Sequence, residues 1–445
     1  MKFWCEYAWL GSEDATAGVL IDVEGERIVS VRIGLAEAPP DAVVLPGYTL
    51  AGLANAHSHA FQRAFRAKTE VGEGTFWTWR QRMYEAAAWL DPDNYFALAR
   101  ATFGEMALAG VTGVGEFHYV HHAPDGTPYE DPNAMGAAVI AAAREAGIRI
   151  TLIDACYLHG GIGEELGPGQ RRFSDGTAER WADRVAEIET GPGVRVGAAI
   201  HSVRAVLPAE AALVAGWARE RGLPLHAHVS EQPAENEACR AAYGRTPTEL
   251  LSEAGAVSER FTAIHVTHPT DHDIALLGAS GASCCFCPTT ERNLADGIGP
   301  AAALRAAGVR PAVGSDSQAV IDLFEECRAV ELDDRLARLE RGNQDAAALL
   351  IAATEEGHHA IGWPEAGAIE RGRLADFVNL RGDGVRLAGI TPASAAASIT
   401  FAATAADVTN VIVGGEFVVR DGRHLKLDVE RELRDSIAAL GTGGA

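Results

Sequence analysis

The stretch LAGLANAHSH, residues 50–59, shapes the fold prediction because an apolar run there ends in two histidines. Alternation along a strand places His57 and His59 on the same side of it. Later apolar stretches also resemble buried strands, and Ala-rich helical segments such as 94–109 and 134–146 separate them. The eight predicted strands cover residues 50–57, 111–117, 148–156, 194–200, 223–229, 261–266, 282–287 and 309–314. This alternation predicts a (β/α)8 TIM-like barrel, an α/β fold.

Short strand-like segments at both ends of the chain lie outside this pattern. They are residues 19–23, 27–31, 367–369, 375–380 and 408–420. Their composition predicts a small β-sandwich domain formed from both chain ends, with the barrel inserted between its two parts. The predicted boundaries are 1–47 and 366–425 for the β-sandwich domain, 48–365 for the barrel and 426–445 for a C-terminal helix.

Charge and cysteine content narrow the classes of partner and compartment. The 445 residues carry 38 Lys and Arg against 61 Asp and Glu, a formal charge of −23, which disfavours nucleic acid and anionic membrane surfaces as partners. No apolar run is long enough to span a membrane. Seven cysteines, an odd and sparse number, predict a reduced cytoplasmic protein. An anionic small molecule would need a few arginines placed in a cleft.

Histidines and carboxylates follow four of the predicted strands, at the barrel end where active sites lie. The strings are HSH at 57–59, HAHVSE at 226–231, HVTH at 265–268 and GSDS at 314–317. Unrelated structural histidines have no reason to gather at four such ends together with a carboxylate. Nitrogen and oxygen donors of this kind suit zinc, with iron or manganese as alternatives. By spacing alone, His226 and His268 stay open as ligands in place of their neighbours.

This pattern, with H-x-H after strand one, H-x-x-E after strand five, His after strand six and Asp after strand eight, resembles the amidohydrolase superfamily over nearly the whole chain. Residues 367–378, GAIERGRLADFV, are similar to the superfamily's return to its terminal β domain. No lysine ends strand four, so the mononuclear branch is implied. The resemblance implies one divalent ion, with zinc favoured, held by His57, His59, His228 and Asp316. It also implies catalytic roles for Glu231 as proton shuttle, for His265 as hydrogen-bond partner of the metal-bound water, and for Asp316.

Four local strings point to a narrower resemblance and to a substrate class. HAFQRA at 59–64, FWTWR at 76–80, EFHYVHH at 116–122 and HSVRAV at 201–206 look like the formimidoylglutamate deiminase family. That family hydrolyses N-formimidoyl-L-glutamate to N-formyl-L-glutamate and ammonia in histidine degradation. The resemblance implies the substrate-binding residues Gln62, Arg80, Tyr119, His201 and Arg204. Guanidinium groups suit a dicarboxylate substrate because each can bind a carboxylate through two charge-assisted hydrogen bonds.

Two other functions stay open at this point. One is an aminohydrolase for a purine or pterin ring with the same metal machinery, which two arginines argue against because a neutral ring needs stacking and amide-type contacts. The other is a catalytically inactive barrel with an assembly role, although none of the ligand positions is empty. The thiols of 284–287 are expected in the core, and His121, His122, Arg171 and Arg172 in solvated loops. A homodimer is compatible with the sequence, which does not determine the oligomeric state.

Overall fold

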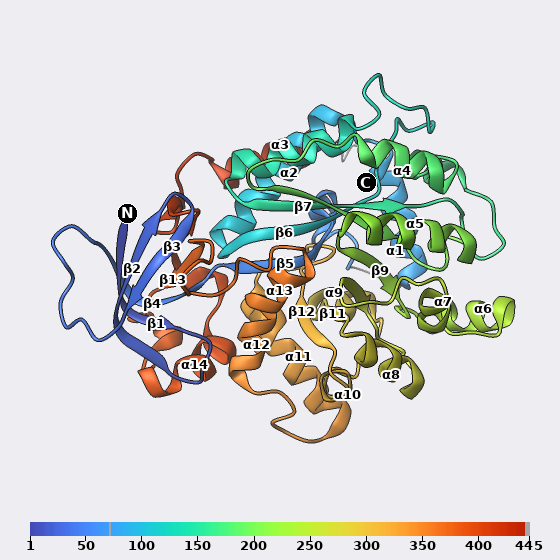
Figure 1. Cartoon of the computed structure of the whole chain (residues 1–445). Helices are drawn as coiled ribbons and strands as arrows, with labels where there is room; N and C mark the ends of the chain where they lie inside the picture. Colours follow the sequence, from blue (N-terminus) through green and yellow to red (C-terminus); the bar gives the residue numbers. More distant parts are fainter. Residues whose placement is uncertain (71–72, 441–445) are drawn as a thin grey trace.

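The computed structural model describes residues 1–70 and 73–440 and contains two eight-stranded sheets. One sheet is parallel and nearly closed into a barrel, and the other is built from both ends of the chain (Figure 1). The predicted (β/α)8 barrel with a second β unit from the chain ends is therefore confirmed. The domain boundaries themselves stay a prediction.

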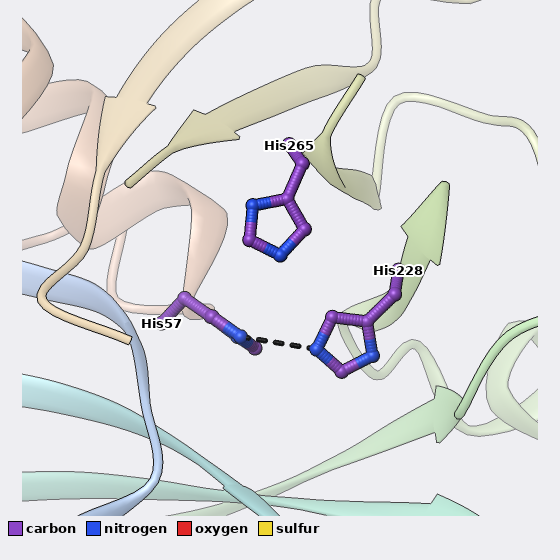
Figure 2. Close-up of side chains that lie close together, drawn as sticks. All are labelled: His57, His228 and His265. Atoms are coloured by element: carbon purple, nitrogen blue, oxygen red, sulfur yellow. Dashed lines mark hydrogen bonds between the residues drawn. The ribbon is translucent and has the colours of Figure 1, made fainter. Parts of the chain in front are cut away.

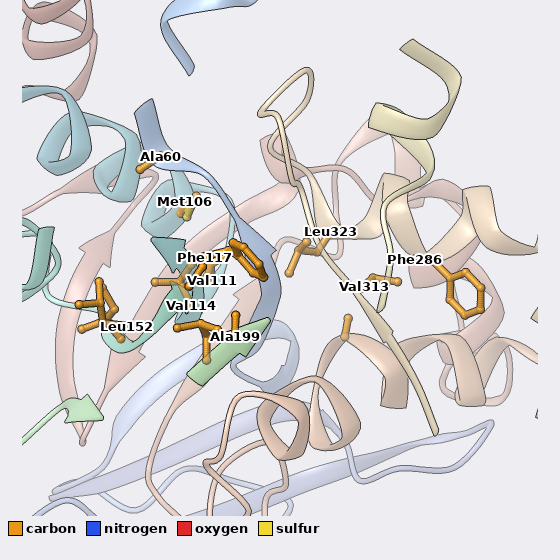
Figure 3. Packing of buried hydrophobic residues seen from close by; sticks show 14 of the residues in the cluster. Ala60, Met106, Val111, Val114, Phe117, Leu152, Ala199, Phe286, Val313 and Leu323 are labelled. Atoms are coloured by element: carbon orange, nitrogen blue, oxygen red, sulfur yellow. The ribbon is translucent and has the colours of Figure 1, made fainter. Parts of the chain in front are cut away.

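The barrel strands are buried on both faces. Every residue of β5, β6, β7, β9, β10 and β11 is buried, as a parallel sheet covered on both sides requires. Apolar side chains such as Val111 and Val114 of β6 pack with Leu152 and Ala199 of the next two strands (Figure 3). The barrel strands are β5 (Leu53–Ser58), β6 (Val111–His118), β7 (Arg149–Cys156), β8 (Val194–Ile200), β9 (Leu225–Val229), β10 (Phe261–His265), β11 (Ser283–Phe286) and β12 (Arg310–Val313).

Helices surround the barrel and connect its strands. The predicted helices 94–109 and 134–146 correspond to α2 and α3. The C-terminal helix α15 packs against α2. Residues 441–445 of the last predicted segment lie outside the described residues. None of the described helices is long and apolar enough to cross a membrane. The helices are α1 (Phe76–Ala87), α2 (Pro92–Leu108), α3 (Ala134–Ala146), α4 (Ala178–Ala186), α5 (Pro208–Arg221), α6 (Pro233–Tyr243), α7 (Pro247–Glu253), α8 (Asp271–Ser280), α9 (Pro288–Leu294), α10 (Ala301–Ala306), α11 (Leu323–Arg338), α12 (Ala346–Ala353), α13 (Glu355–Ala360), α14 (Ala395–Ala402) and α15 (Val429–Ala439).

The second sheet joins the two ends of the chain in the order β16-β15-β14-β13-β4-β1-β2-β3. The N-terminal strand β4 pairs antiparallel with the C-terminal strand β13, while β1 and β4 run parallel. A separate apolar core that includes Phe3, Ile21 and Phe377 lies against this sheet. The strands are β1 (Lys2–Trp9), β2 (Ala15–Glu24), β3 (Arg27–Arg32), β4 (Val43–Ala51), β13 (Phe377–Leu380), β14 (Val408–Val413), β15 (Glu416–Arg420) and β16 (Arg423–His424).

Two strand predictions need correction. The predicted strand 50–57 is divided at Gly52, because Leu50 and Ala51 pair with β13 of the second sheet and β5 begins at Leu53. A Cβ at Gly52 would lie 2.1 Å from Thr112, so only glycine fits where the chain passes between the sheets. Residues 367–369 form a turn and not a strand, since Gly367 has a φ of 81° and lies against the backbone between α12 and α13.

The contact between β5 and β12, which closes the barrel, differs from the contacts between the other neighbouring strands. Hydrogen-bonded ladders join the seven other neighbouring pairs, whereas in the described residues an isolated parallel bridge between Ser58 and Asp316 joins these two strands. The bridge consists of bonds from Asp316 N to His57 O and from His59 N to Asp316 O, both 3.0 Å long. The first and last barrel strands therefore meet at the residues expected to bind the metal.

Candidate metal centre and active site

Four imidazoles and one carboxylate from different barrel strands converge at the C-terminal mouth of the barrel. His57 and His59 come from the end of β5, His228 from β9, His265 from the end of β10 and Asp316 from the segment after β12. Ring centroids lie 4.8 Å apart for His57 and His59 and 5.0 Å apart for His57 and His228. Figure 2 shows His57, His228 and His265 pointing toward one another from three strands. We call these five residues the metal centre.

Hydrogen bonds at the outer ring nitrogens orient these imidazoles. Nδ1 of His59 lies 3.0 Å from Phe117 O, Nδ1 of His228 lies 2.9 Å from His201 O, and Nδ1 of His265 lies 3.2 Å from a Glu291 carboxylate oxygen. Each of these oxygens accepts a hydrogen bond, so each ring carries a proton on Nδ1. In the neutral rings of His59 and His228 this directs the Nε2 lone pair inward, in the tautomer that suits a metal ligand.

The inward-facing atoms form a donor set that fits a divalent ion. Nε2 of His57 lies 3.2 Å from Nε2 of His228 and 3.4 Å from Oδ1 of Asp316, and Nε2 of His59 lies 3.4 Å from the same oxygen. Nδ1 of His57 has no partner among the described residues, and with the ring proton on that atom a cation between the facing nitrogens would satisfy all of them. Neutral imidazole and carboxylate are the ligands that zinc prefers, and iron or manganese would also accept them.

Burial and charge set the protonation states that metal binding needs. Burial lowers the pKa of His57 to about 3 and also lowers the pKa values of His59 and His228, which keeps these rings neutral. Burial opposes the ionisation of Asp316, but its contacts with the imidazoles lower its pKa overall. His265 differs: burial opposes its protonation, but the hydrogen bond to Glu291 and the nearby carboxylates raise its pKa to about 10.

The alternative ligands His226 and His268 point elsewhere. Nε2 of His226 lies 2.9 Å from Ala360 O, at the opposite end of the barrel interior, where α13 covers it. Nε2 of His268 lies 2.7 Å from Asp296 O. Both rings therefore donate from Nε2 to a carbonyl, and neither belongs to the groups whose ligand atoms gather at the barrel mouth.

The metal centre opens into a narrow pocket with a cavity volume of about 50 Å³. Helix α1 covers this pocket, contributing Phe76, Trp79, Arg80, Met83 and Tyr84 to its lining. The residues proposed to bind substrate also line it, namely Gln62, Arg80, Tyr119, His201 and Arg204, together with His59, His228, Glu231, His265 and Asp316. Apart from His57, the sequence positions expected to bind metal, move protons and bind substrate thus line one pocket.

Arg204 and Glu231 form the charged wall of this pocket. Nη2 of Arg204 donates to Oε2 of Glu231 over 2.7 Å, while Oε1 of Glu231 lies 3.8 Å from Nε2 of His265. Nη1 of Arg204 is buried and has no hydrogen-bond partner among the described residues. Burial disfavours the guanidinium charge, but Glu235 and Glu231 raise the pKa of Arg204, so its charge is retained. An unpaired N–H of a buried guanidinium is suited to bind an anion.

Arg80 occupies the opposite wall and is held by neutral oxygens. Its guanidinium donates to the Tyr84 hydroxyl, to Gly160 O over 3.0 Å and to the Tyr157 hydroxyl over 3.4 Å. None of these three contacts is with a carboxylate, so they do not neutralise the positive charge of Arg80. Gln170 supports the same hydroxyl, since its Nε2 donates to the oxygen of Tyr157 over 2.7 Å.

Gln62, Tyr119 and His201 complete the pocket beside the metal centre. Nε2 of Gln62 donates to the Tyr119 hydroxyl over 3.1 Å, and its Oε1 has no partner in the described part of the chain. The ring of Tyr119 lies 5.2 Å from that of His59 and 5.6 Å from that of His201. Amide, phenol and imidazole groups are thereby placed next to the position where a reacting group would bind.

Sequence reasoning missed Tyr84 and Tyr157, and it assigned no role to Gln170. Tyr157 directly follows β7, so its place at a strand end was a usable signal for a residue at the barrel mouth. Tyr84 lies two helical turns into α1, one turn after Arg80, where helical spacing places the two side chains on one face. Gln170 lies in the loop after β7, and no periodicity in the sequence indicates which way that loop turns.

Two expectations about loops are wrong. Arg172 is 1% exposed and not solvated, because its guanidinium donates to the carbonyl oxygens of Ala87, Leu90 and His122. His121 and His122 are also buried, beside carboxylates on the outer side of the barrel. Arg171 is exposed, as expected.

The seven cysteines are free and buried, as expected for core residues. Cys287 also lies beside the metal centre, since its Sγ lies within 4.8 Å of ligand atoms of His265 and Asp316. Burial raises the pKa of the Cys287 thiol well above its ordinary value, so it is present as a neutral, weakly polar group.

Comparison with known proteins agrees with the fold. Residues 48–418 match the amidohydrolase family. The chain is 38% identical to formimidoylglutamate deiminase of Pseudomonas aeruginosa, over 92% of this chain and 93% of that protein, and 29% identical to 5-methylthioadenosine/S-adenosylhomocysteine deaminase of Natronomonas pharaonis, over 96% and 94%. The crystal structure of an amidohydrolase from Brucella melitensis superposes with a TM-score of 0.89 at 35% identity, covering 99% of both chains. The chain therefore belongs to the amidohydrolase family.

Proposed function

We propose that the protein hydrolyses N-formimidoyl-L-glutamate to N-formyl-L-glutamate and ammonia, with one divalent ion at the metal centre. His57, His59, His228 and Asp316 would hold the ion, and zinc is the metal that this donor set favours. The similarity to a formimidoylglutamate deiminase supports the reaction. Seven free thiols, all buried, support a cytoplasmic protein acting in histidine degradation.

The observation that carries the proposal is the pair of guanidinium groups in the pocket. Arg80 and Arg204 line the same cavity as Glu231 and the metal centre in a protein with a formal charge of −23. A buried positive charge is costly to desolvate, and Nη1 of the buried Arg204 has no partner among the described residues, while Arg80 is held in the pocket by neutral oxygens. A substrate with two carboxylates would use both, whereas an uncharged ring would leave both unused.

The reaction breaks one carbon–nitrogen bond and forms one carbon–oxygen bond. A divalent ion, when bound, lowers the pKa of a coordinated water toward ~7 and so supplies a nucleophile at neutral pH. Arg80 and Arg204 would hold the substrate carboxylates, which places the formimidoyl carbon beside His59 and Asp316. Helix α1 covers the pocket and limits the access of bulk water to it.

Glu231 would move the proton between the two halves of the reaction. Its Oε2 is held by Arg204 and its Oε1 faces Nε2 of His265, so one oxygen is fixed while the other reaches the centre of the site. Glu231 would carry both protons of the attacking water, one after the other, to the departing nitrogen, which leaves as ammonia while the water oxygen becomes the formyl oxygen. His265 would orient the attacking oxygen by a hydrogen bond, and Glu291 fixes the tautomer of its ring.

The rival function is deamination of a purine or pterin ring. Deaminases of this kind are among the relatives, at 28–29% identity. The two arginines disfavour the rival, because a neutral ring offers no carboxylate to either guanidinium group. The second alternative, an inactive assembly protein, is disfavoured because each position in the donor set holds a group that can bind a metal.

Mass spectrometry of the product tests the proposal directly. Metal-loaded protein is incubated with N-formimidoyl-L-glutamate, and ammonia release is compared with that from adenosine, 5-methylthioadenosine and guanine. We expect N-formylglutamate and one ammonia per turnover from the first substrate and none from the rings. Free glutamate would show that a different bond is broken, and ring deamination alone would favour the rival. A metal content below about a tenth of an equivalent per chain would favour the inactive barrel.

A further inference from the structure

The seam between β5 and β12 places metal ligands on both of its sides. His57 and His59 lie at the end of β5, and Asp316 follows β12, with a single backbone bridge between the two segments. Gly314 allows this close contact, because a Cβ there would lie 2.7 Å from His57 O and 2.8 Å from His57 N. The distance between Asp316 and the two histidines therefore depends on how closely this seam is held.

A chain of side-chain hydrogen bonds crosses the seam directly behind the ligands. Gln318 Nε2 donates to Ser58 Oγ over 2.9 Å, and Ser58 Oγ donates to Glu116 Oε2 over 2.5 Å. Ser315 Oγ donates to Gln318 Oε1 over 2.7 Å, and Asn55 Nδ2 donates to Ser315 Oγ over 2.6 Å. We call Asn55, Ser58, Glu116, Ser315 and Gln318 the seam network.

The seam network also fixes the backbone that carries the ligands. Gln318 Nε2 donates to Asp316 O over 2.9 Å, and Glu116 Oε1 accepts from Ala60 N over 2.6 Å, just after His59. Asn55 Oδ1 accepts from Ser315 N over 2.9 Å. Each ligand segment is therefore anchored by a side chain whose other bonds belong to the network.

All five side chains are fully buried, at 0% exposure. Buried polar groups are tolerated when every member has partners, and such networks specify one arrangement of the groups around them. Asp316 and Gln318 have φ values of 44° and 62°, a left-handed conformation that non-glycine residues rarely adopt. The network holds this strained segment in place, since both ends of the Gln318 amide are bonded.

We propose that Gln318 and Ser58 are positioning residues of the metal centre, because through the seam network they set the separation of Asp316 from His57 and His59. The inference rests on the proposed metal centre. Groups that hold a metal ligand in its orientation tune the affinity of the site for the metal. Loss of such an outer hydrogen-bond partner costs about 10–100-fold in metal affinity. Removing the Gln318 amide should therefore weaken metal binding without removing a ligand.

The test measures zinc affinity by competition with a chromophoric chelator, and thermal unfolding of the metal-free and zinc-loaded protein. Gln318→Met keeps the side-chain volume and removes the network bonds. We expect its zinc affinity to fall at least tenfold and the zinc-induced rise in Tm to shrink accordingly. Ser58→Ala removes one oxygen and keeps the bonds of Gln318 to Ser315 and Asp316. This milder variant tests the same inference if Gln318→Met does not fold.

Thr151→Val is the matched control. Thr151 is fully buried in β7, donates to Ile361 O over 2.6 Å and shares no hydrogen bond with the seam network. This variant should lower Tm equally with and without zinc and leave zinc affinity unchanged. The inference is overturned if Gln318→Met and Ser58→Ala bind zinc within about twofold of wild type while only their Tm falls. If wild type itself binds no zinc, the proposed metal centre fails and the inference fails with it.

Discussion

Two buried clusters of histidine and aspartate occupy opposite sides of the same barrel wall. The metal centre, inside the mouth, contains His57, His59, His228, His265 and Asp316. The outer cluster, between the wall and its helices, contains His118, His121, His122, Asp154 and Asp175. Ligand atoms of His118, His121 and Asp154 lie within 4.8 Å of one another, as close as those of the metal centre. Composition and proximity alone do not distinguish the two clusters.

The two clusters differ in what neutralises their carboxylates. In the outer cluster, the guanidinium of Arg184 donates to both oxygens of Asp154 at 2.8 and 3.0 Å and to both oxygens of Asp175 at the same two distances. Trp181 Nε1 also donates to Asp154 over 2.9 Å. These carboxylates are fully satisfied by an arginine already present, so a metal ion would have to compete with a fixed positive charge.

Asp316 has no such partner: across residues 1–70 and 73–440 its ion-pair contacts are with imidazoles alone. In the outer cluster, His121 Nε2 lies 3.0 Å from Ala155 O and donates to it, so this nitrogen is not free to bind a metal. A cluster of histidine and aspartate therefore becomes a metal site where the inward nitrogens lack protons and the carboxylate lacks an arginine.

Removing one aspartate from each cluster should have opposite consequences, and this is the largest effect that we predict. Asp316→Asn should lose bound zinc to below about a tenth of an equivalent and lose activity with it. Asp154→Asn should keep one equivalent of zinc but lose about 3 kcal/mol of stability, because part of the Arg184 charge is left unpaired in a buried site. Metal analysis and urea unfolding of both variants measure this. Zinc loss from Asp154→Asn would show that the clusters are not distinct.

Glu231→Gln should separate catalysis from metal binding within the metal centre. The amide fills the same space and keeps a contact with Arg204, but it cannot take up and return a proton. We expect kcat to fall by about 10²–10⁴-fold with zinc content unchanged. Glu235→Gln is the control, because Glu235 is buried nearby and accepts from Glu231 N but does not line the pocket. Turnover close to that of wild type in Glu231→Gln would assign the proton transfer to another group.

Arg80→Lys should show whether the pocket arginines bind carboxylates. Lysine keeps the charge but loses the forked donors that contact Gly160 O and Tyr157. We expect kcat/KM for N-formimidoyl-L-glutamate to fall by about 10–100-fold, mainly through KM, as for loss of a charge-assisted hydrogen bond. Arg171→Lys, in the exposed part of the loop after β7, should leave both constants unchanged. An unchanged KM in Arg80→Lys would exclude this arginine from substrate binding.

The sequence predicts the barrel, and the gathering of His57, His59, His228, His265 and Asp316 at its mouth, because both depend on local order. Apolar strands ending in polar residues repeat along the chain, and the ends of parallel strands meet at one mouth whatever the loops do. Alternation also contains the signal that was not used for the outer cluster: Phe117 lies against His57 inside the barrel, so His118 must face outward.

The features that sequence reasoning missed depend on contacts between distant segments. Arg172 is buried because its loop crosses the carbonyl oxygens that follow α1, and nothing near residue 172 indicates this. Gly52 ends one strand and begins another because two sheets meet there, although the apolar run continues through it. Gln170 and Tyr157 support Arg80 across the pocket, a relation that appears only when the chain is folded.

The smallest predicted effect is the pH dependence that the outer cluster contributes to stability. Burial opposes ionisation of Asp175, but the contacts with His122 and Arg184 lower its pKa below the ordinary value of 3.8. A lowered pKa contributes stability that is fully present above the unfolded-state value and is lost as the pH falls toward the folded-state value. Asp175→Asn should therefore be less stable than wild type by about 1–2 kcal/mol at pH 7. This difference should shrink as the pH falls below about 4, because the unfolded wild-type chain then takes up a proton at Asp175 while the folded protein keeps that carboxylate ionised. Urea unfolding of both proteins between pH 3 and pH 7 measures it, and a difference that stays constant to pH 3 would mean that the Asp175 charge contributes nothing to stability.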